Sequence, residues 1–313
     1  MDRLFSDEAM PAHLRGGIVA LGNFDGFHLG HQAVVGHAVE TAARDDRPVI
    51  VATFDPHPAR FFRPDTPPFR LTSLDQRERL FAAAGAHAML VFRFDDALAA
   101  TSAEDFVRLL VEHMGAVCVV TCTDFTFGKA RGGSVATLSD LGTTMGFAVR
   151  AVDPVMDAEG LVVSSSRIRK ALTDGDCTTA TRLLTRPFAV EGVVMHGDKV
   201  GRELGFPTAN VDMGPYLRPA YGVYAIRGRL ADGRVVDGAA NLGIRPQFEP
   251  PKELLEPYFF DFSGDLYGQL VEVQLIERIR GEAKFDGLDA LKDQIARDCE
   301  TARHILADQS RLA

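Results

Sequence analysis

One stretch decides the fold of the first half of this chain: Gly22-Asn23-Phe24-Asp25-Gly26-Phe27-His28-Leu29-Gly30-His31. The apolar run 17–21 before it predicts a buried strand, and the residues from His31 to about Ala43 predict a helix. A helix start offers free backbone N–H groups and the positive end of the dipole, which favour an anion. Glycines let the backbone turn sharply and let a phosphate come close. The stretch therefore predicts a nucleotide phosphate site, to which His28 and His31 add two donors.

Two other interpretations of the histidine pair remain open at this point. Two histidines three residues apart can ligate zinc on one helix face. A third ligand would then be needed, and His57, in Asp55-Pro56-His57-Pro58, is a candidate that the fold could bring near. Alternatively, both histidines only cap or pack the helix, which is the ordinary role of a single histidine.

The length and charge of the chain limit its class. It has 313 residues, of which 46% are hydrophobic, and a net charge of −9. This length predicts two domains with sizeable cores. Wide binding to nucleic acid requires clustered Lys and Arg, so the acidic balance argues against a nucleic-acid partner. A local basic pocket for a nucleotide is still compatible with it.

The location is predicted from what the chain lacks. Residues 1–8 do not have the apolar core of a signal peptide, and no apolar run approaches the length of a membrane span. The four cysteines match no CxxC spacing. Cys118 and Cys122 fall in or beside a strand-like run and are expected to be buried free thiols. We therefore expect a cytoplasmic protein with no membrane partner.

Strand-like and helix-like segments alternate over the first ~185 residues. We predict strands at 18–22, 48–54, 87–92, 116–122 and 148–152, and helices such as 74–84 and 103–114, the second capped by Ser102. This alternation indicates a parallel α/β sheet with helices on both faces. Ligands of such sheets bind beyond the carboxyl ends of the strands, which is where the 22–31 turn begins.

The pattern changes near residues 183–188, and we place the domain boundary so that the domains span 1–186 and 187–313. Short alternating runs at 188–195, 222–230, 235–242 and 270–278 predict an antiparallel β-barrel, and Asp232-Gly233 is a strong hairpin signal. A final helix is predicted at 288–307. Its apolar stripe comprises Leu288, Leu291, Ile295, Cys299, Ala302 and Ile305.

Two further segments of the first half could hold a nucleotide or a flat ring. Ser164-Ser165-Ser166 precede a helix-like stretch, 167–172, that carries Arg169. Serines cap helices, and together with arginine they can hold phosphate oxygens. The segment 123–133 places Phe125 and Phe127 beside a glycine-rich basic loop, where a heteroaromatic ligand could stack, as it could at Phe61 and Phe62. The alternative is that these rings belong to the core.

The segment 195–210 joins a glycine loop to a proline and two small polar residues. Thr208 and Asn210 are two residues apart, so an extended chain presents both oxygens on one side. Magnesium takes a few oxygen ligands together with nucleotide phosphates, so we expect this pair to bind Mg²⁺. The loop is not a Walker A sequence, and the alternative is an ordinary hairpin loop.

In their order along the chain, these motifs resemble those of the bifunctional riboflavin kinase/FMN adenylyltransferases, the prokaryotic FAD synthetases. The N-terminal modules of that family carry a G-x-FDG-x-H-x-GH turn, a Phe-Glu/Asp-Pro-His-Pro element, an Asn/Asp-Phe-x-Phe-Gly segment and a Ser-Ser-Thr-x-x-Arg motif. Residues 22–31, 54–58, 124–128 and 164–169 match them here. The resemblance implies a Rossmann-like nucleotidyltransferase domain, followed by a riboflavin kinase-like β-barrel and a helix.

The resemblance also implies roles for residues of the first half. His28 and His31 would hold the ATP phosphates, with Arg169 as a further catalytic group. The other ATP candidates are Gly22, Asn23, Phe24, Asp25, Ser164 and Ser165. The FMN candidates are Phe62, Asp124, Phe125 and Phe127. Two positions depart from the family pattern: Ser166 replaces the usual Thr, and Cys122 stands where Gly is frequent.

The second half resembles the riboflavin kinase module of the same family. Segments 186–188, 205–210, 221–224, 241–246 and 261–268 match its signatures in order. The resemblance assigns Gly201, Thr208 and Asn210 to ATP and Mg²⁺, and Arg245 to the flavin. Glu256 aligns with the family's base, which could accept the proton of the riboflavin 5′-hydroxyl as it attacks the γ-phosphorus.

This region departs most from the family pattern. Gln247 replaces the usual Thr, and Pro257 and Tyr258 stand where an apolar residue and often His are found. Proline cannot donate a ladder hydrogen bond, so we expect the strand carrying Glu256 to be an edge strand or to be distorted. Glu249 and Glu253 are alternative bases if the register shifts.

The sequence thus predicts two ATP-dependent reactions: phosphorylation of riboflavin to FMN, and adenylylation of FMN to FAD with release of pyrophosphate. Magnesium is expected for both. Two alternatives remain: an FMN adenylyltransferase with a weakened kinase module, and a flavin-binding regulatory protein. A pure binder has no need for two intact phosphate loops. The oligomeric state is not predicted.

Overall fold

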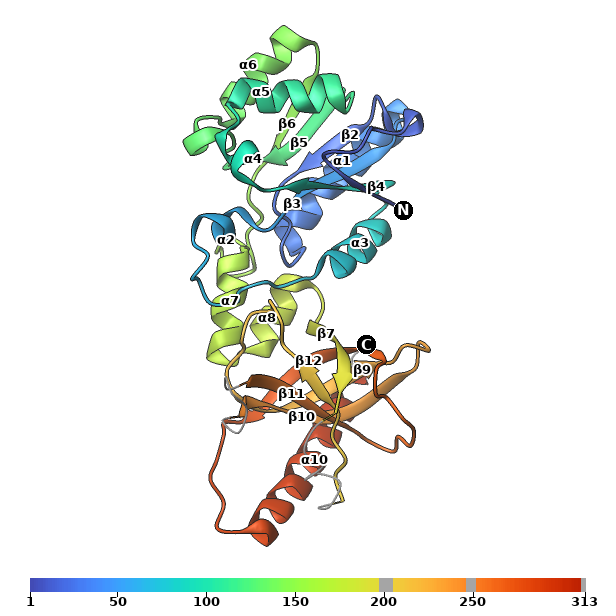
Figure 1. The fold of residues 1–313 in the computed structure, drawn as a ribbon, viewed down its shortest axis with the longest axis vertical. Helices are drawn as coiled ribbons and strands as arrows, with labels where there is room; N and C mark the ends of the chain where they lie inside the picture. Colours follow the sequence, from blue (N-terminus) through green and yellow to red (C-terminus); the bar gives the residue numbers. More distant parts are fainter. Residues whose placement is uncertain (197–204, 246–251, 311–313) are drawn as a thin grey trace. The chain divides into compact units, whose positions relative to one another are not determined.

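Six parallel strands form the sheet of the first half, in the order β1-β4-β3-β2-β5-β6 (Figure 1). Their bounds are Asp2–Phe5 (β1), Ile18–Leu21 (β2), Val49–Asp55 (β3), Ala88–Arg93 (β4), Cys118–Cys122 (β5) and Ala148–Val152 (β6). The five predicted strands are confirmed with small shifts at their ends. The short edge strand β1 was not predicted, because its residues Asp2 and Arg3 interrupt any apolar pattern.

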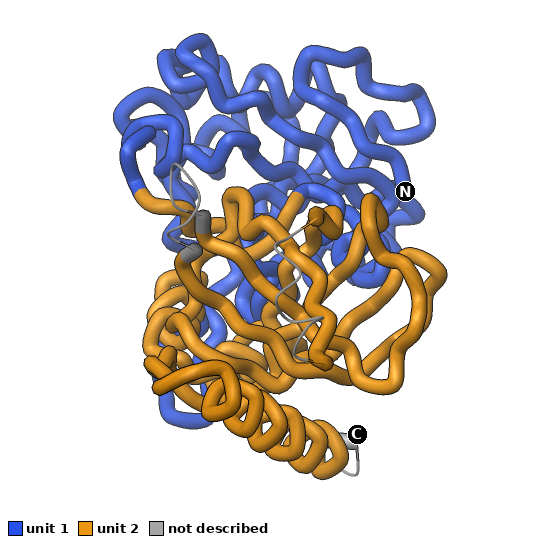
Figure 2. Tube along the Cα trace, turned by 60° about the horizontal axis from the view of Figure 1, so that its bottom comes forward, with its two compact units in different colours: residues 1–66, 74–164 blue, residues 67–73, 165–313 orange. Residues whose placement is uncertain are grey.

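This computed structural model describes residues 1–196, 205–245 and 252–310. It contains two compact units, shown in Figure 2: residues 1–66 with 74–164, and residues 67–73 with 165–313. The helices of the first unit are Leu29–Asp45 (α1), Pro58–Phe62 (α2), Leu74–Ala83 (α3), Asp96–Ala100 (α4), Ala103–Arg108 (α5) and Val135–Met145 (α6). Short helical turns lie at Ala12–Leu14, Leu109–His113 and Lys129–Arg131.

The predicted helices 74–84 and 103–114 are present, although the second is irregular. It begins as α5, with the side chain of Ser102 accepting the N–H of Asp105 as predicted. It then widens into a π-helical turn at Leu109–His113. The predicted helical stretch is therefore confirmed to His113, with a last turn that is π-helical.

The parallel sheet is buried on both faces, as predicted. Alternate residues of β2 enter two different cores: Val19 and Leu21 pack with Phe106, whereas Ile18 and Ala20 pack with Val34 of α1. The chain order reverses around β2, because β3 and β4 lie on one side of it and β5 and β6 on the other. Such a reversal opens a crevice at the carboxyl ends of the strands, where α/β sheets bind ligands. The 22–31 turn leaves β2 at this point.

A closed antiparallel barrel forms the second unit, in the order β10-β11-β8-β7-β12-β9. Its strands are Phe188–Met195 (β7), Asn210–Asp212 (β8), Gly222–Arg229 (β9), Val235–Arg245 (β10), Lys252–Phe259 (β11) and Leu270–Arg280 (β12). The predicted hairpin at Asp232-Gly233 joins β9 to β10, and Gly233 adopts the positive φ of 86° that such turns require. The barrel prediction is confirmed, and β8 and β11 complete it.

In the part of the second unit that the structure describes, the helices are Ser165–Asp174 (α7), Cys177–Leu184 (α8) and Leu288–Ser310 (α10). Cys299, Ala302 and Leu306 of α10 are buried against the barrel. The predicted stripe is wrong at Leu288, which is 64% exposed, because the apolar cluster beneath α10 begins at Ile295.

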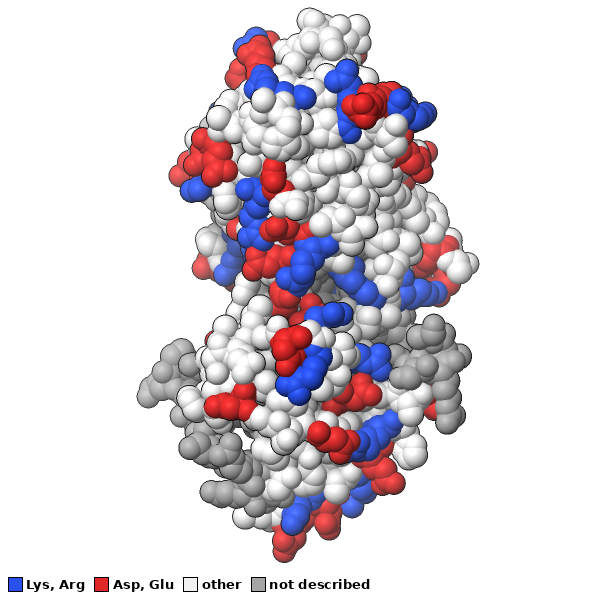
Figure 3. All heavy atoms as spheres, turned by 90° about the vertical axis from the view of Figure 1, so that its right-hand side faces the viewer, with Lys and Arg blue, Asp and Glu red and all other residues white. Residues whose placement is uncertain are grey.

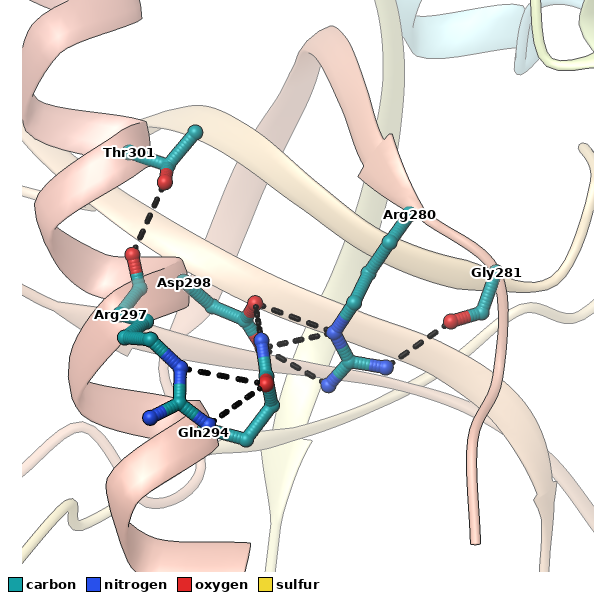
Figure 4. A network of polar contacts seen from close by, with 6 residues as sticks. All are labelled: Arg280, Gly281, Gln294, Arg297, Asp298 and Thr301. Atoms are coloured by element: carbon teal, nitrogen blue, oxygen red, sulfur yellow. Dashed lines mark hydrogen bonds and ion pairs between the residues drawn. The ribbon is translucent and has the colours of Figure 1, made fainter.

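A polar network also ties α10 to strand β12 (Figure 4). The guanidinium of Arg280 donates from Nε and Nη2 to the carboxylate of Asp298, with Nη2 2.7 Å from Oδ2. Gln294 donates to the same carboxylate at 2.8 Å. Asp298 is buried, and this forked pairing compensates for the loss of its hydration.

Charged side chains of both signs are interspersed over the face shown in Figure 3. Exposed ion pairs connect successive turns within a helix, such as Arg108 with Glu104 in α5 and Lys170 with Asp174 in α7. Pairs of this kind add little to stability. The two sheet cores and the barrel interior therefore supply most of the folding free energy.

Candidate functional site

The 22–31 turn folds into a strained backbone that packing holds in place. Phe24, Gly26 and Phe27 all have positive φ, at 50°, 87° and 40°. Side chains other than glycine rarely adopt this region, and where they do the surroundings must stabilise it. Phe24 and Phe27 are buried and pack edge-on against Phe81 of α3, with ring centroids 5.8 and 5.1 Å away. The turn is thus a rigid part of the core.

His28 is the N-cap of α1, and its ring Nδ1 accepts the N–H of Gly30 at 3.1 Å. Because Nδ1 is an acceptor, a neutral His28 carries its proton on Nε2. The ring stacks on that of His31, with centroids 3.6 Å apart and 21° between the planes. Helix α1 therefore begins at Leu29, two residues before the predicted start, because His28 rather than a later residue caps it. The pair forms one unit at the positive end of the helix dipole.

Two other residues of the turn are buried beside the histidines. Asp25 is 3% exposed, and His28 is 5% exposed. The side-chain Oδ1 of Asn23 is buried and has no hydrogen-bond partner in the described part of the chain. A buried acceptor of this kind needs an explanation, and a donor on a bound ligand would supply one.

The aromatic candidates form a continuous series within the first unit. Phe62 is 63% exposed, and its ring meets that of Phe94 at 5.7 Å. At the other end of the series, Phe125 stacks on Phe127 at 5.8 Å. Phe127 is 6% exposed and belongs to the core, whereas Phe125 is half-buried and Asp124 is exposed. Among the four candidate rings Phe61 is also half-buried, so a ligand can reach Phe61, Phe62 and Phe125, with Phe62 the most exposed.

The Ser164–Arg169 motif lies where the two units divide, since Ser164 ends the first unit and Ser165 begins the second. Helix α7 begins at Ser165, so the prediction that the helix starts at Arg167 is wrong by two residues. Nε of Arg169 donates to the carbonyl of Phe69 at 2.9 Å, and the guanidinium carbon lies 5.0 Å from the centre of the Phe69 ring.

Three polar side chains share one row across the barrel strands. In the β10–β11 register Asn241 lies opposite Glu256, and Nδ2 of Asn241 is 3.3 Å from Oε2 of Glu256. In the β8–β11 register Val211 lies opposite Leu255, so Asn210 comes next to Glu256 on its other side. Thr208 precedes Asn210 by two residues. The register therefore places Asn210, one of the two predicted metal ligands, next to the predicted base, whereas Thr208 lies ahead of β8.

The strand that carries Glu256 is not an edge strand, because β11 pairs on both sides within a closed barrel. Its ladder with β10 runs without a break through Pro257, which lies opposite Ala240. The carbonyl of Pro257 accepts the N–H of Ala209, so the position without an N–H faces β8. Any distortion is confined to that side, since the described β8–β11 pairs are Leu254 with Asp212 and Leu255 with Val211.

The alternative base Glu253 is already engaged. It accepts Nε of Arg218 at 2.7 Å and the hydroxyl of Tyr221. Burial acts to raise the pKa of Glu253, but these two donors outweigh it and lower the pKa below the ordinary value. The other alternative, Glu249, lies outside the described residues, as do Gly201, Gln247 and the side chain of Arg245.

Comparison of the chain with known proteins shows the family to which it belongs. A family model described as FAD synthetase matches residues 10–167, and one described as riboflavin kinase matches residues 184–306. The bifunctional riboflavin kinase/FMN adenylyltransferase of Escherichia coli K12 is 39% identical over 289 residues, which is 92% of each chain. The chain belongs to this family.

Other relatives cover nearly the whole chain. The family member from Pseudomonas fluorescens is 39% identical over 95% of each chain. A solved structure described as a macrolide-efflux protein from Streptococcus pneumoniae is 31% identical, with a TM-score of 0.86 over 97% of this chain and 99% of that one. Family members therefore share both units, and their two activities use ATP.

Sequence reasoning missed the buried polar residues that support these sites. Thr53, Thr121 and Arg77 are each at most 2% exposed, and all three contact the exit of β2. Thr53 and Thr121 interrupt otherwise apolar strands, which is a readable signal. Arg77 sits in Asp75-Gln76-Arg77-Glu78, which looks like the solvated face of a helix. Asn241 was part of a quoted motif but was not identified as a partner of Glu256.

The remaining predictions concern metals, thiols and membranes. Within the described residues no group of three or more His, Cys, Asp or Glu side chains could hold a metal ion, so nothing there supports the zinc interpretation. All four cysteines are free, and burial raises the pKa of Cys177 to about 12. Cys118 is buried as predicted, whereas Cys122 is only half-buried.

Of the helices that the structure describes, none combines the length and apolarity needed to cross a membrane.

Proposed function

We propose that this chain makes FAD from riboflavin in two ATP-dependent steps, with one active site within residues 1–186 and one within residues 187–313. The observation that carries the proposal is the presence of two separate clusters of polar side chains in one chain. One is the histidine turn at the reversal point of the parallel sheet. The other is the row of Asn210, Glu256 and Asn241 on the barrel. Each suits one of the two family activities.

The histidine turn is suited to adenylyl transfer. As a phosphate oxygen of FMN attacks the α-phosphorus of ATP, negative charge develops on the α-phosphate and pyrophosphate leaves. Preorganised donors aimed at that charge are the main source of catalysis in such reactions. His28 and His31 supply them, and the N-terminus of α1 adds its dipole. Gly22, Asn23, Phe24 and Asp25 shape the same pocket.

The rest of the adenylyl site comes from three other segments. Ser164, Ser165 and Arg169 contribute hydroxyl and guanidinium donors to ATP. Phe62 and Phe125 stack on the flavin ring, since Phe62 is exposed and Phe125 is half-buried. Phe127 supports the ring of Phe125 from the core, and Asp124 binds a polar edge of the flavin.

Glu256 is the general base of riboflavin phosphorylation in this proposal. Its carboxylate takes the proton of the 5′-hydroxyl as that oxygen attacks the γ-phosphorus. The amide of Asn241 orients the carboxylate by donating to Oε2. Gly201 belongs to the phosphate loop, and Arg245 binds the flavin.

Thr208 and Asn210 fit a magnesium ion, because both carry oxygen atoms and lie two residues apart, so an extended chain would present both on one side. When bound, the ion would neutralise charge on the phosphates. Asn210 is only 9% exposed, which holds its side chain in a defined place beside Glu256.

The structure favours the two-step function over an adenylyltransferase with a weakened kinase. The weakened-kinase hypothesis was based on Pro257, which was expected to disrupt the strand that carries Glu256, and on Gln247, which lies outside the described residues. The ladder between β10 and β11 continues through Pro257, so Glu256 stays paired with Asn241. We propose functional modules of residues 1–186 and 187–313, and a cytoplasmic location, for which the four free thiols are suited.

A flavin assay tests this function directly. The purified protein is incubated with riboflavin, ATP and Mg²⁺, and the flavins are separated over time. We expect FMN to appear first and FAD to follow. Absence of both would refute the proposal. FAD from added FMN, without FMN from riboflavin, would support the adenylyltransferase alternative, and tight flavin binding without ATP turnover would support a regulatory protein.

A further inference from the structure

A buried arginine and a buried threonine meet at the backbone of the histidine turn. Thr53 of β3 is fully buried, and Arg77 of α3 is 2% exposed. Nη1 of Arg77 lies 2.9 Å from Oγ1 of Thr53 and 3.3 Å from the carbonyl oxygen of Asn23. Oγ1 of Thr53 lies 2.7 Å from the same carbonyl oxygen. Two elements far apart in the sequence thus converge on one peptide group.

The direction of these hydrogen bonds follows from the chemistry of the groups. A guanidinium can only donate hydrogen bonds, so Arg77 donates to the hydroxyl oxygen of Thr53 and to the carbonyl oxygen of Asn23. The hydroxyl has one proton, and it is therefore directed at the carbonyl of Asn23. The carbonyl has two lone pairs and can accept both donors. The Asn23–Phe24 peptide is held from its carbonyl side.

Holding this carbonyl also sets the direction of the next N–H. In a trans peptide the N–H and the C=O point in opposite directions, so the N–H of Phe24 points away from Arg77 and Thr53. None of the described residues accepts that N–H in a hydrogen bond. Phe24 begins the left-handed part of the turn, at φ 50°. A fixed backbone donor in this position suits a phosphate oxygen.

We propose that Arg77 and Thr53 are positioning residues for adenylyl transfer, acting through the Asn23–Phe24 peptide. This inference rests on the proposed function. A purely structural role explains the pair poorly, because burying a guanidinium is unfavourable and an apolar residue would fill the space. Strand β3 is otherwise apolar from Val49 to Phe54, so Thr53 also departs from its surroundings.

The test compares two threonine variants of the full chain. Thr53→Val removes the hydroxyl and nearly keeps the volume. Thr41→Val makes the same change at another buried threonine of the first unit, whose hydroxyl donates to the carbonyl of His37 in α1 at 2.8 Å. Steady-state rates of FAD formation from FMN, FMN formation from riboflavin and thermal unfolding are measured for both.

We expect Thr53→Val to lower kcat for FAD formation by about 10-fold, as for one lost hydrogen bond of ~1.4 kcal/mol, with KM for FMN unchanged. Thr41→Val should keep the wild-type kcat, and riboflavin phosphorylation should be unchanged in both variants. Equal kcat values for the two variants would overturn the inference. Loss of both activities in Thr53→Val would also overturn it, because the effect would then be one on folding.

Arg77 provides a second, independent comparison. Arg77→Lys keeps a charged donor, whereas Arg77→Met removes it with similar length. We expect the lysine variant to retain several-fold more FAD formation than the methionine variant, and equal rates would contradict the inference. If the wild-type protein forms no FAD, the proposed function itself fails, and that result is distinct from a failure of the variants alone.

Discussion

The two phosphate sites that we propose for this chain are built in opposite ways. In the first, consecutive residues form a left-handed turn, and His28 is both the cap of α1 and a proposed ligand of ATP. In the second, Asn210, Glu256 and Asn241 come from three strands and meet through their register. The first site depends on local chain geometry, and the second depends on how distant strands pair. A change in one site should therefore leave the other working.

Loss of the histidines should give the largest effect. We expect His28→Ala combined with His31→Ala to lower FAD formation from FMN by at least about 10³-fold, since each donor to a developing charge contributes about 10²–10³-fold. FMN formation from riboflavin should remain. Because Ala also removes the N-cap, His28→Asn is the matched variant: asparagine caps helices well, so stability should be kept while activity is lost. Stable His28→Asn protein with full FAD formation would contradict the assigned role.

The reverse selectivity is expected at the barrel. Glu256→Gln should lower FMN formation by about 10²–10⁴-fold, the usual contribution of a general base, and leave FAD formation from added FMN intact. Thr208→Ala should show the same selectivity. Glu253→Gln is the control on the same strand, because Glu253 is already bound by Arg218 and Tyr221. If Glu253→Gln stopped the kinase and Glu256→Gln did not, the base assignment would be wrong.

A smaller effect is expected at the exposed aromatic ring of the first unit. Phe62→Ala should raise KM for FMN in FAD formation by up to about 10-fold, because one aromatic contact contributes ~0.5–1.5 kcal/mol. KM for riboflavin in the kinase reaction should not change. Leu288→Ala, at a similarly exposed apolar residue of the second unit, is the control and should affect neither constant. An unchanged KM for FMN in Phe62→Ala would remove Phe62 from the flavin site.

The smallest effect concerns stability and pH. Hydrogen bonds from Tyr221 and Arg218 outweigh burial and keep the pKa of Glu253 below its ordinary value of 4.5. The resulting stabilisation is present above pH 4.5 and is lost as the pH falls through the lowered folded-state pKa. Glu253→Gln should therefore unfold up to about 3 °C below the wild type at pH 7, and this gap should shrink at acidic pH. A gap that stayed constant with pH would contradict the predicted ion pair.

The difference between the two sites also explains what could be predicted from the sequence. The histidine turn was readable because strand, glycines and helix follow one another directly. The β-barrel could be predicted from the alternation of apolar and polar residues and from the Asp232-Gly233 turn. The partners of Glu256 could not be predicted, because the sequence of one strand does not determine which residues of another strand lie opposite it. The expectation of an edge strand failed for the same reason. Pro257 disfavours pairing locally, but its missing N–H faces β8, so the ladder between β11 and β10 on the other side continues through Pro257.

The buried polar side chains that hold the backbone of the 22–31 turn were the feature of the site that the sequence predicted least well. Arg77 lies among Asp75, Gln76 and Glu78, and only the packing of α3 shows that its guanidinium is buried. The stripe of α10 was wrong at Leu288 because periodicity does not show where a helix first meets its partner. Local patterns thus predicted the elements, and tertiary packing decided which polar side chains became buried.

The most direct test of two independent sites is a mixing experiment. The His28→Ala/His31→Ala variant and the Glu256→Gln variant are each given riboflavin, ATP and Mg²⁺, separately and in an equal mixture. We expect the first alone to stop at FMN, the second alone to leave riboflavin unchanged, and the mixture to produce FAD. A mixture that accumulates FMN without FAD, from variants that remain folded, would contradict the account of one complete active site in each of the modules 1–186 and 187–313.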